Sequence, residues 1–348
     1  VTLDGVTVKA AKVVNKADGM MIYPTDAQKQ SSNNGYSILE KLTLANLRID
    51  NIRHSITAID NRGGVQIRIN GIVVGKPDML ALNPKDISKI DFINNPGVRY
   101  GDGIAYVINI VTRRNGTGYT VGMDLTSALT TLQGDDMVYG KWNKGKSELS
   151  FSYDVSGYKT KGEKSKQSAD YTLTDGSIYT IERNDVESLR KSISHDAKLT
   201  YNWADSTATV FQASLNGAFN NTPDNYTVKD IVDGTRQYKA TSRAKDKSYS
   251  PVLDIYFFRQ LTPRQSVTAN AVATYISTQT SSYYDEGAPY KYNVDGKTAS
   301  LLTEVIYENR LKPFTFSTGL NNSYKYIKNN YLGDASALTK TNNNRLYA

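Results

Sequence analysis

Apolar and polar side chains alternate along the chain from about residue 118 to its last residue, in one segment after another. Leu199, Tyr201 and Trp203, for example, are separated by Thr200 and Asn202. Successive side chains of a β-strand point to opposite faces, so a period of two indicates strands with one apolar and one polar face. Antiparallel sheets carry this pattern because one of their faces can be solvated. The alternation therefore predicts an antiparallel, all-β body for this part of the chain.

Two kinds of connection join these expected strands. Short turns are expected at residues 143–146, 203–206, 261–264 and 311–313. Longer polar stretches, which we expect to be loops, lie at residues 160–186, 221–243, 285–297 and 330–342. Short turns on one side and long loops on the other are typical of transmembrane β-barrels. About nine strands are complete by this interpretation, and a further strand begins near Asn344.

Composition narrows the class of protein further. The sequence has no cysteine, which excludes a disulfide framework and a thiolate metal site. No apolar run approaches the roughly twenty residues of a membrane-spanning helix, but barrel strands that alternate also average to a polar hydropathy. The 25 tyrosines suit membrane–water interfaces, where an apolar ring carries a polar tip. The net charge of +8 comes without a basic helix or a nucleic-acid motif, so nucleic-acid binding is not expected.

The part of the chain before residue 115 has a different pattern, which predicts a small unit of strands and helices. Asn70-Gly71 between two β-branched runs predicts a two-residue hairpin. Asn83-Pro84 predicts the start of a helix with Asn83 as its N-cap. Residues 106–111 are the most apolar run here and predict a buried strand, and residues 37–44 favour a short helix.

Four blocks in this part carry a family resemblance. They are VQIRINGIVV at residues 65–74, PKDISKIDFI at 84–93, NPGVRYG at 95–101 and VINIVTRR at 107–114. In this order they resemble the plug domain of TonB-dependent outer-membrane receptors, and the I-R-I-N-G block is closer to the Bacteroidetes-type outer-membrane β-barrel receptors than to the starch-utilisation type. The resemblance implies an α+β plug at residues 1–115 and the N-terminal part of an antiparallel transmembrane β-barrel at residues 116–348. The barrel is expected to be incomplete here, because the family's barrel has about twenty-two strands.

The resemblance also implies a function. Such a receptor lies in the outer membrane of a Gram-negative bacterium and actively takes up an extracellular ligand, which can be a siderophore, a peptide or a glycan. Its expected partners are the TonB C-terminal domain, outer-membrane lipid and the extracellular ligand, with a surface lipoprotein as a further candidate. No enzymatic activity and no cofactor are implied. The alternative is a cell-surface adhesion or structural protein without transport, in which the apolar strand faces would meet each other in a β-sandwich.

Three groups of site residues follow from the resemblance. The extended, β-branched start of the chain is either a Ton box, which pairs as a strand with TonB, or an ordinary first strand of the plug. Its residues are Thr2, Leu3, Asp4, Val6, Thr7 and Val8. Arg99 and Tyr100 match the family's N-P-x-x-R-Y-G block, and they form either a releasable lock between plug and barrel or permanent packing. Asn61 and Arg62 are expected in an apical loop of the plug that faces the extracellular vestibule.

Other patterns in the sequence favour structural interpretations. Residues 140–147 match the G-x-x-x-x-G-K-[ST] expression of a phosphate-binding loop, but an alternating strand follows instead of the required helix, so we expect a hairpin turn. His195 lies on the apolar face of its strand, which favours a packing or membrane-interface role. Glu304 and Glu308 share a polar face, and a polar lumen wall accounts for them as well as a pair of catalytic carboxylates does.

Overall fold

The computed structural model describes most of the chain. The described residues are 12–16, 19–94, 96, 100, 103–113, 117–205, 208–311, 314–334 and 336–347. The chain folds into two compact units, which are described separately. Unit 1 comprises Val1–Gly122 with Tyr139–Lys146, and unit 2 comprises Met123–Val138 with Ser147–Ala348. The described residues are mostly β-sheet with few and short helices.

Unit 1 is built on a six-stranded mixed sheet with the strand order β1-β2-β7-β8-β5-β6. Its strands are β1 (Lys12–Lys16), β2 (Gly19–Tyr23), β5 (Gly64–Ile69), β6 (Ile72–Val73), β7 (Ile87–Ile93) and β8 (Ile104–Thr112). β5 and β8 are parallel, whereas the other neighbours are antiparallel. β3 (Leu47–Asp50) and β4 (Ser55–Ala58) form a separate antiparallel hairpin.

Short helices complete the core of unit 1. They are α1 (Asp26–Gln30), α2 (Gly35–Glu40), α3 (Lys76–Leu80) and the 3₁₀ turn η1 (Pro84–Asp86). Ile38 and Leu39 of α2 are fully buried, as are Met79 of α3 and Ile90 and Ile108 of the central strands. Gly35 lies directly against Met79, and a Cβ at this position would meet its side chain at 2.7 Å. Because Gly35 has no side chain, α2 can pack closely against α3.

Several local predictions for unit 1 are confirmed. The Asn70-Gly71 hairpin forms, with φ of 53° and 85° at its two turn residues, as a two-residue turn of this kind requires. The buried strand predicted at residues 106–111 lies within β8. Asn83 accepts a hydrogen bond from the backbone N–H of Lys85, but only the single turn η1 follows, not a longer helix. The helix expected at residues 37–44 runs over Gly35–Glu40 instead, because Thr43 adopts a φ of 48° that interrupts it.

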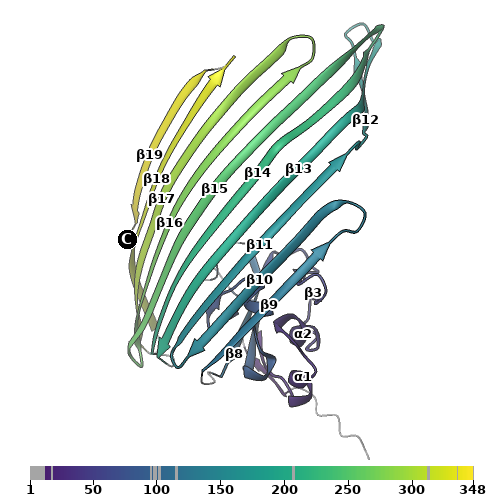
Figure 1. Ribbon diagram of the computed structural model, residues 1–348. Helices are drawn as coiled ribbons and strands as arrows, with labels where there is room; N and C mark the ends of the chain where they lie inside the picture. Colours follow the sequence, from purple (N-terminus) through teal and green to yellow (C-terminus); the bar gives the residue numbers. More distant parts are fainter. Residues whose placement is uncertain are drawn as a thin grey trace, which may run out of the picture. The chain divides into compact units, whose positions relative to one another are not determined.

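The second sheet is antiparallel and has eleven strands among the described residues (Figure 1). They are β9 (Gly118–Ser127), β10 (Leu132–Lys144), β11 (Ser147–Lys161), β12 (Lys166–Thr172), β13 (Ile178–Asp205), β14 (Thr209–Asp233), β15 (Arg236–Thr262), β16 (Gln265–Asp285), β17 (Pro289–Leu311), β18 (Phe314–Gly333) and β19 (Ala337–Tyr347). Neighbours in the sheet follow chain order from β13 to β19, and β11 separates β10 from β13. The sheet does not close on itself among these residues, since β9 and β19 are its edges. None of the described helices has the length and apolar character needed to cross a membrane.

β11 and β12 together act as one interrupted strand. Lys161 at the end of β11 lies opposite Leu189, and Lys166 at the start of β12 lies opposite Asn184. The two pairs are five positions apart along β11 and β12 and also five positions apart along β13. The pairing with β13 therefore keeps the same register on both sides of the break. If β11 and β12 count as one strand, the last expected strand is β19, which begins at Ala337 and not near Asn344.

The prediction of long loops is wrong, whereas two of the four short turns are confirmed. The polar stretches expected as loops are largely strand, so that β13 alone runs for 28 residues. Strand pairing uses backbone hydrogen bonds and needs no apolar face. A strand with water on both sides therefore need not alternate apolar and polar side chains, and the prediction depended on that alternation. The turns expected at residues 143–146 and 261–264 join β10 to β11 and β15 to β16, whereas the other two expected turns include residues outside those that the structure describes.

Candidate functional site

One face of the long sheet exposes an apolar band. In the register, Leu199 lies opposite Leu215, which lies opposite Leu253, and Leu301 continues the same row through Ala273. Residues directly opposite in antiparallel strands point to the same face. Leu215 is 52% exposed and Leu253 is 41% exposed. A contiguous, exposed apolar surface of this kind marks an interaction with another protein or with a membrane.

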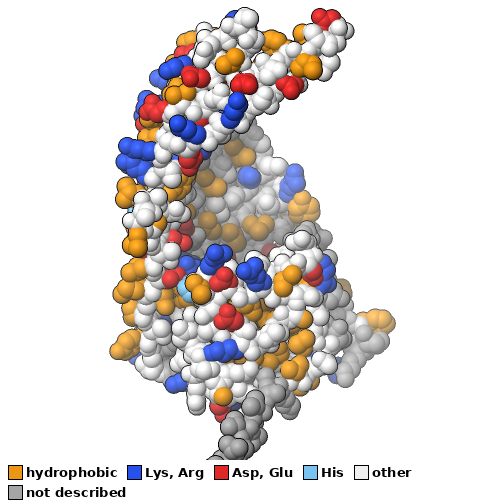
Figure 2. Space-filling view, turned by 90° about the vertical axis from the view of Figure 1, so that its right-hand side faces the viewer, with side chains coloured by type: hydrophobic (Ala, Val, Ile, Leu, Met, Phe, Trp, Pro, Cys, Tyr) orange, Lys and Arg blue, Asp and Glu red, His pale blue; other side chains and the backbone are white. Residues whose placement is uncertain are grey.

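Aromatic residues flank this band at both ends. Near the short turns, Trp203 lies opposite Phe211, and Phe211 lies opposite Phe257. Farther along the same face, His195 lies opposite Phe219, and Phe219 lies opposite Tyr249. Membrane barrels carry an outward apolar band bounded by aromatic girdles, so this face has the surface chemistry of a lipid-facing wall. Figure 2 shows hydrophobic side chains gathered along the lower part of the left-hand edge of this sheet.

His195 belongs to the aromatic group that lies farther from the short turns, which we call the upper aromatic group. Its Nδ1 lies 2.8 Å from the hydroxyl oxygen of Tyr153, and its ring lies 5.9 Å from that of Phe219. These contacts support the packing or interface role expected from the sequence. The described residues contain no group of three or more His, Cys, Asp or Glu side chains that could hold a metal ion.

The opposite face of the same strands is mainly polar, although its central row continues from Asp254 through Val272 to Leu302. Thr200 lies opposite Ser214, and Ser214 lies opposite Asp254. Glu304 accepts hydrogen bonds from the side-chain amides of Asn270 at 3.0 Å and Asn321 at 3.5 Å. Glu308 instead forms an ion pair with Arg310 at 2.6 Å. The two carboxylates thus have separate partners, which fits a polar wall better than paired acid–base catalysis.

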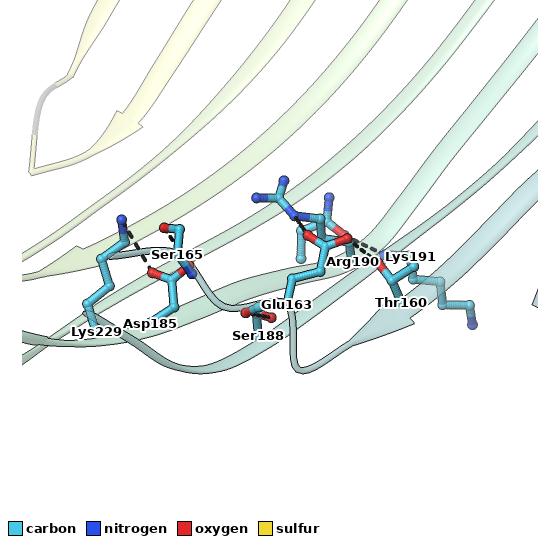
Figure 3. A network of polar contacts seen from close by, with 9 residues as sticks. Thr160, Glu163, Ser165, Asp185, Ser188, Arg190, Lys191 and Lys229 are labelled. Carbon is cyan, nitrogen blue, oxygen red and sulfur yellow. Dashed lines mark hydrogen bonds and ion pairs between the residues drawn. The ribbon is translucent and has the colours of Figure 1, made fainter. Parts of the chain in front are cut away.

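A polar network holds the break between β11 and β12 in place (Figure 3). Glu163 in the break accepts hydrogen bonds from the Nε of Arg190 at 2.8 Å and the hydroxyl of Thr160 at 3.1 Å. Asp185 on β13 accepts from the backbone N–H and the hydroxyl of Ser165 at 3.1 and 3.0 Å, and its other oxygen lies 3.5 Å from the ammonium of Lys229. The carboxylates replace the interrupted strand pairing with side-chain bonds, so the long hairpin keeps its register.

In unit 1, a rigid loop precedes β5. Arg62 and the fully buried Tyr106 form a hydrogen bond, and the Arg62 guanidinium lies 4.9 Å above the Tyr106 ring. The Tyr106 hydroxyl donates to Asp60 at 2.6 Å, and Asp60 also forms an ion pair with Arg62. Gly63 then passes so close to Gly103 that a Cβ would meet the Gly103 carbonyl oxygen at 2.4 Å, and its φ is 154°. The loop therefore holds exposed Asn61 and half-exposed Arg62 in a fixed geometry.

Asp60 and Tyr106 were missed by the sequence analysis, although Asn61 and Arg62 were singled out. A single tyrosine in the largely aliphatic strand β8 was a signal, because a buried hydroxyl needs a hydrogen-bond partner. The hydrogen bond from Tyr106, followed by those from Arg62, holds the pKa of Asp60 below its ordinary value. A lowered pKa stabilises the fold above the ordinary carboxyl pKa of about 3.9, and this contribution is lost as the pH falls through the folded-state pKa.

Replacing Tyr106 with Phe should therefore make the stability of unit 1 less dependent on pH in the acid range. Phe keeps the stacking on Phe92, whose ring lies 5.8 Å away, but removes the hydroxyl that bonds Asp60. We expect the variant to be less stable than the wild type at neutral pH, and this difference should shrink as the pH falls through the pKa of Asp60, leaving only the part due to the lost bond from Arg62. Thermal unfolding measured from pH 3 to pH 7 checks this, with Tyr100→Phe as control. A difference that persists unchanged at pH 3 would contradict the role given to Asp60.

The other predicted site residues are only partly described. Thr2 to Val8 and Arg99 lie outside the described residues. Tyr100 lies in unit 1, where the Arg68 guanidinium is 5.0 Å above its ring and its carbonyl accepts a hydrogen bond from Gln66. Residues 140–147 form the end of β10, a turn at Gly145 with φ of 56°, and the start of β11. The phosphate-loop expression therefore falls on a hairpin, as expected.

No protein-family model matches this sequence, and no curated protein matches it. Solved structures that the fold resembles are TonB-dependent outer-membrane receptors, at low identity and low TM-score. The ferric yersiniabactin uptake receptor FyuA of Yersinia pestis is 12% identical with a TM-score of 0.44, over 94% of this chain and 60% of that one. The ferric citrate transporter FecA is 11% identical with a TM-score of 0.37, over 97% and 59%. The alcaligin outer-membrane receptor FauA of Bordetella pertussis is 10% identical with a TM-score of 0.37, over 94% and 58%. The chain thus spans 58–60% of the length of these three proteins.

Proposed function

We propose that this chain is part of a TonB-dependent outer-membrane receptor that takes up an extracellular ligand. The observation that carries the proposal is the two-faced sheet: one face has an exposed apolar band between two aromatic groups, and the other face carries mainly Ser, Thr, Asn, Asp and Glu. In water such an apolar face would be costly to expose, whereas lipid covers it without cost. The polar face then lines the interior of a barrel, where a ligand passes.

The adhesion or structural alternative is less well supported by these contacts. A β-sandwich buries the apolar faces of two sheets against each other. Here Leu199, Leu215 and Leu253 remain 41–52% exposed within the part of unit 2 that the structure describes. This surface lacks the burial that a sandwich core requires.

In the proposed receptor, residues 1–115 form the plug, and residues 116–348 form part of the barrel. Val1–Val8 carry the Ton box that binds the TonB C-terminal domain, and Arg99 with Tyr100 locks the plug to the barrel. Asn61 and Arg62 contact the ligand from the loop that precedes β5. An Arg guanidinium suits anionic or hydrogen-bonding ligands, and siderophores, peptides and glycans all offer such groups. A surface lipoprotein could supply ligand at the extracellular end.

Localisation and energy-dependent uptake test this proposal together. The protein should fractionate with the outer membrane of a Gram-negative host. Cells that carry it should deplete one compound from a panel of ferric siderophores, oligopeptides and oligosaccharides, and depletion should stop in a strain without TonB. A protein that stays in the soluble fraction, or uptake that is equal with and without TonB, would contradict the proposal.

A further inference from the structure

Three lysines lie side by side on neighbouring strands of the apolar-band face. Lys297 of β17 is directly opposite Lys328 of β18, and Lys328 is directly opposite Lys340 of β19. The same row contains Tyr249 through Ser277, so the lysines share the face of the apolar band. Opposed residues in antiparallel strands have Cβ atoms about 4.5–5.5 Å apart, and like charges at that spacing destabilise the sheet.

The pattern occurs a second time on the same face. Lys159 of β11 is directly opposite Lys191 of β13, and Lys247 on β15 follows Tyr249 at the next position on this face. None of these six lysines forms an ion pair with a carboxylate among the residues that the structure describes. Asp295, two residues from Lys297 on the same face, is not bonded to any of them there. We refer to Lys159, Lys191, Lys247, Lys297, Lys328 and Lys340 as the lysine belt.

The lysine belt begins at the row of Tyr249 and extends beyond it, on the side away from the short turns. Moving along β15 away from the short turns, the next position on this face after Tyr249 is Lys247. Along β18 in the same direction, the next position on this face after Tyr326 is Lys328. In Figure 2, Lys and Arg side chains lie above the hydrophobic side chains along the left-hand edge of the sheet. In a membrane, aromatic rings lie at headgroup level, so the lysines would reach the headgroups and the phosphates attached to them.

We propose that the lysine belt binds the phosphate groups of glycolipid headgroups in the outer leaflet, of the lipid A type. This inference rests on the proposed membrane placement. Lys ammonium groups bind phosphate as point charges, and basic clusters at membrane surfaces bind anionic headgroups. A phosphate between two opposed lysines turns their mutual repulsion into attraction, which explains why a sheet would keep three lysines in one row. The bound lipid would fasten β17, β18 and β19 at the membrane surface.

Lipid binding by purified protein in detergent tests the proposal. Binding of bisphosphorylated lipid A is measured by the shift in thermal unfolding midpoint on titration. The triple variant Lys297→Gln/Lys328→Gln/Lys340→Gln should bind on the order of a hundredfold more weakly, and Lys328→Gln alone about fivefold, since each lysine near a membrane surface contributes a similar increment. Lys325→Gln removes one positive charge from the opposite face of β18 and should bind as the wild type does. Without lipid, the triple variant should unfold at a higher temperature than the wild type, because the repulsion is gone.

Two further ligands identify the source of the phosphate. Lipid A without its phosphates and inorganic phosphate at the same concentration should both leave the unfolding midpoint of the wild type unchanged. Wild-type affinity in the triple variant, or an equal effect of phosphate-free lipid A, overturns the inference. Insertion into phospholipid vesicles is measured in parallel. A wild-type protein that inserts but shows no difference from the triple variant refutes the lysine belt alone, whereas one that does not insert refutes the membrane placement as well.

Discussion

Deletion of Val1–Val8 should reduce uptake to the level of cells without TonB and leave ligand binding at the cell surface unchanged. A Ton box works by adding a strand to its partner, so backbone hydrogen bonds supply the affinity. Removing the segment removes the connection to the energy source but none of the contacts that hold the ligand. Depletion of the compound that the wild type takes up, together with surface binding in the cold, measures the two effects separately. Unchanged uptake would place the energising segment elsewhere in the protein.

A pair of substitutions at Val6 separates the two interpretations of this segment. Val6→Pro removes a backbone donor and disfavours strand pairing, whereas Val6→Thr keeps a β-branched side chain that suits a strand. If the segment is a Ton box, Val6→Pro abolishes binding to the purified TonB C-terminal domain and does not change the unfolding temperature, and Val6→Thr changes neither. If the segment is an ordinary first strand of the plug, Val6→Pro lowers the unfolding temperature.

The sequence predicts the strands with one apolar face well and the strands beyond the band poorly. Along residues 195–203 apolar and polar side chains alternate almost completely, because the two faces of this strand are exposed to different environments. At Thr222 and Asn225 the register between β14 and β15 shifts, with Pro223 between them. A proline is tolerated at such a bulge, and this one lies in the polar stretch 221–243 that was expected to be a loop. Both faces of this region are mostly polar, with Val228, Ile231 and Val232 as the only aliphatic residues of β14 after Asn225, so no regular period distinguishes the strand from a loop.

Side-chain networks were the least predictable part of the candidate site. Nothing in the local sequence pairs Asp60 with Tyr106, which is 46 residues away and is brought near by the parallel pairing of β5 and β8. The break at residues 162–165 has a local signal in Gly162, whose φ is 71°. Its closure by Asp185 on the neighbouring strand depends on a register that the sequence does not reveal. The lysine belt became apparent only through that register, because Lys297, Lys328 and Lys340 are far apart in the chain but adjacent across the sheet.

Replacing Leu215 with Lys should largely prevent assembly in the membrane, whereas the same change at the neighbouring Ser214 should be tolerated. Leu215 lies in the middle of the apolar band, 52% exposed between Leu199 and Leu253. A lysine facing lipid near the bilayer midplane costs about 2–4 kcal/mol, a large part of the 5–15 kcal/mol that typically stabilises a folded protein. Ser214 points to the other face, where Asp254 lies directly opposite and can form an ion pair with the new lysine.

Folding into phospholipid vesicles, followed by the unfolding free energy in urea, compares the two variants under identical conditions. The pair is matched because both variants add one lysine to adjacent positions of β14, so that the change in net charge is the same. Loss of folding in Ser214→Lys with normal folding in Leu215→Lys would mean that the polar face meets the lipid and the register assignment is reversed. Normal folding of both variants would mean that neither face contacts hydrocarbon, and the membrane placement would then fail together with the function proposed from it.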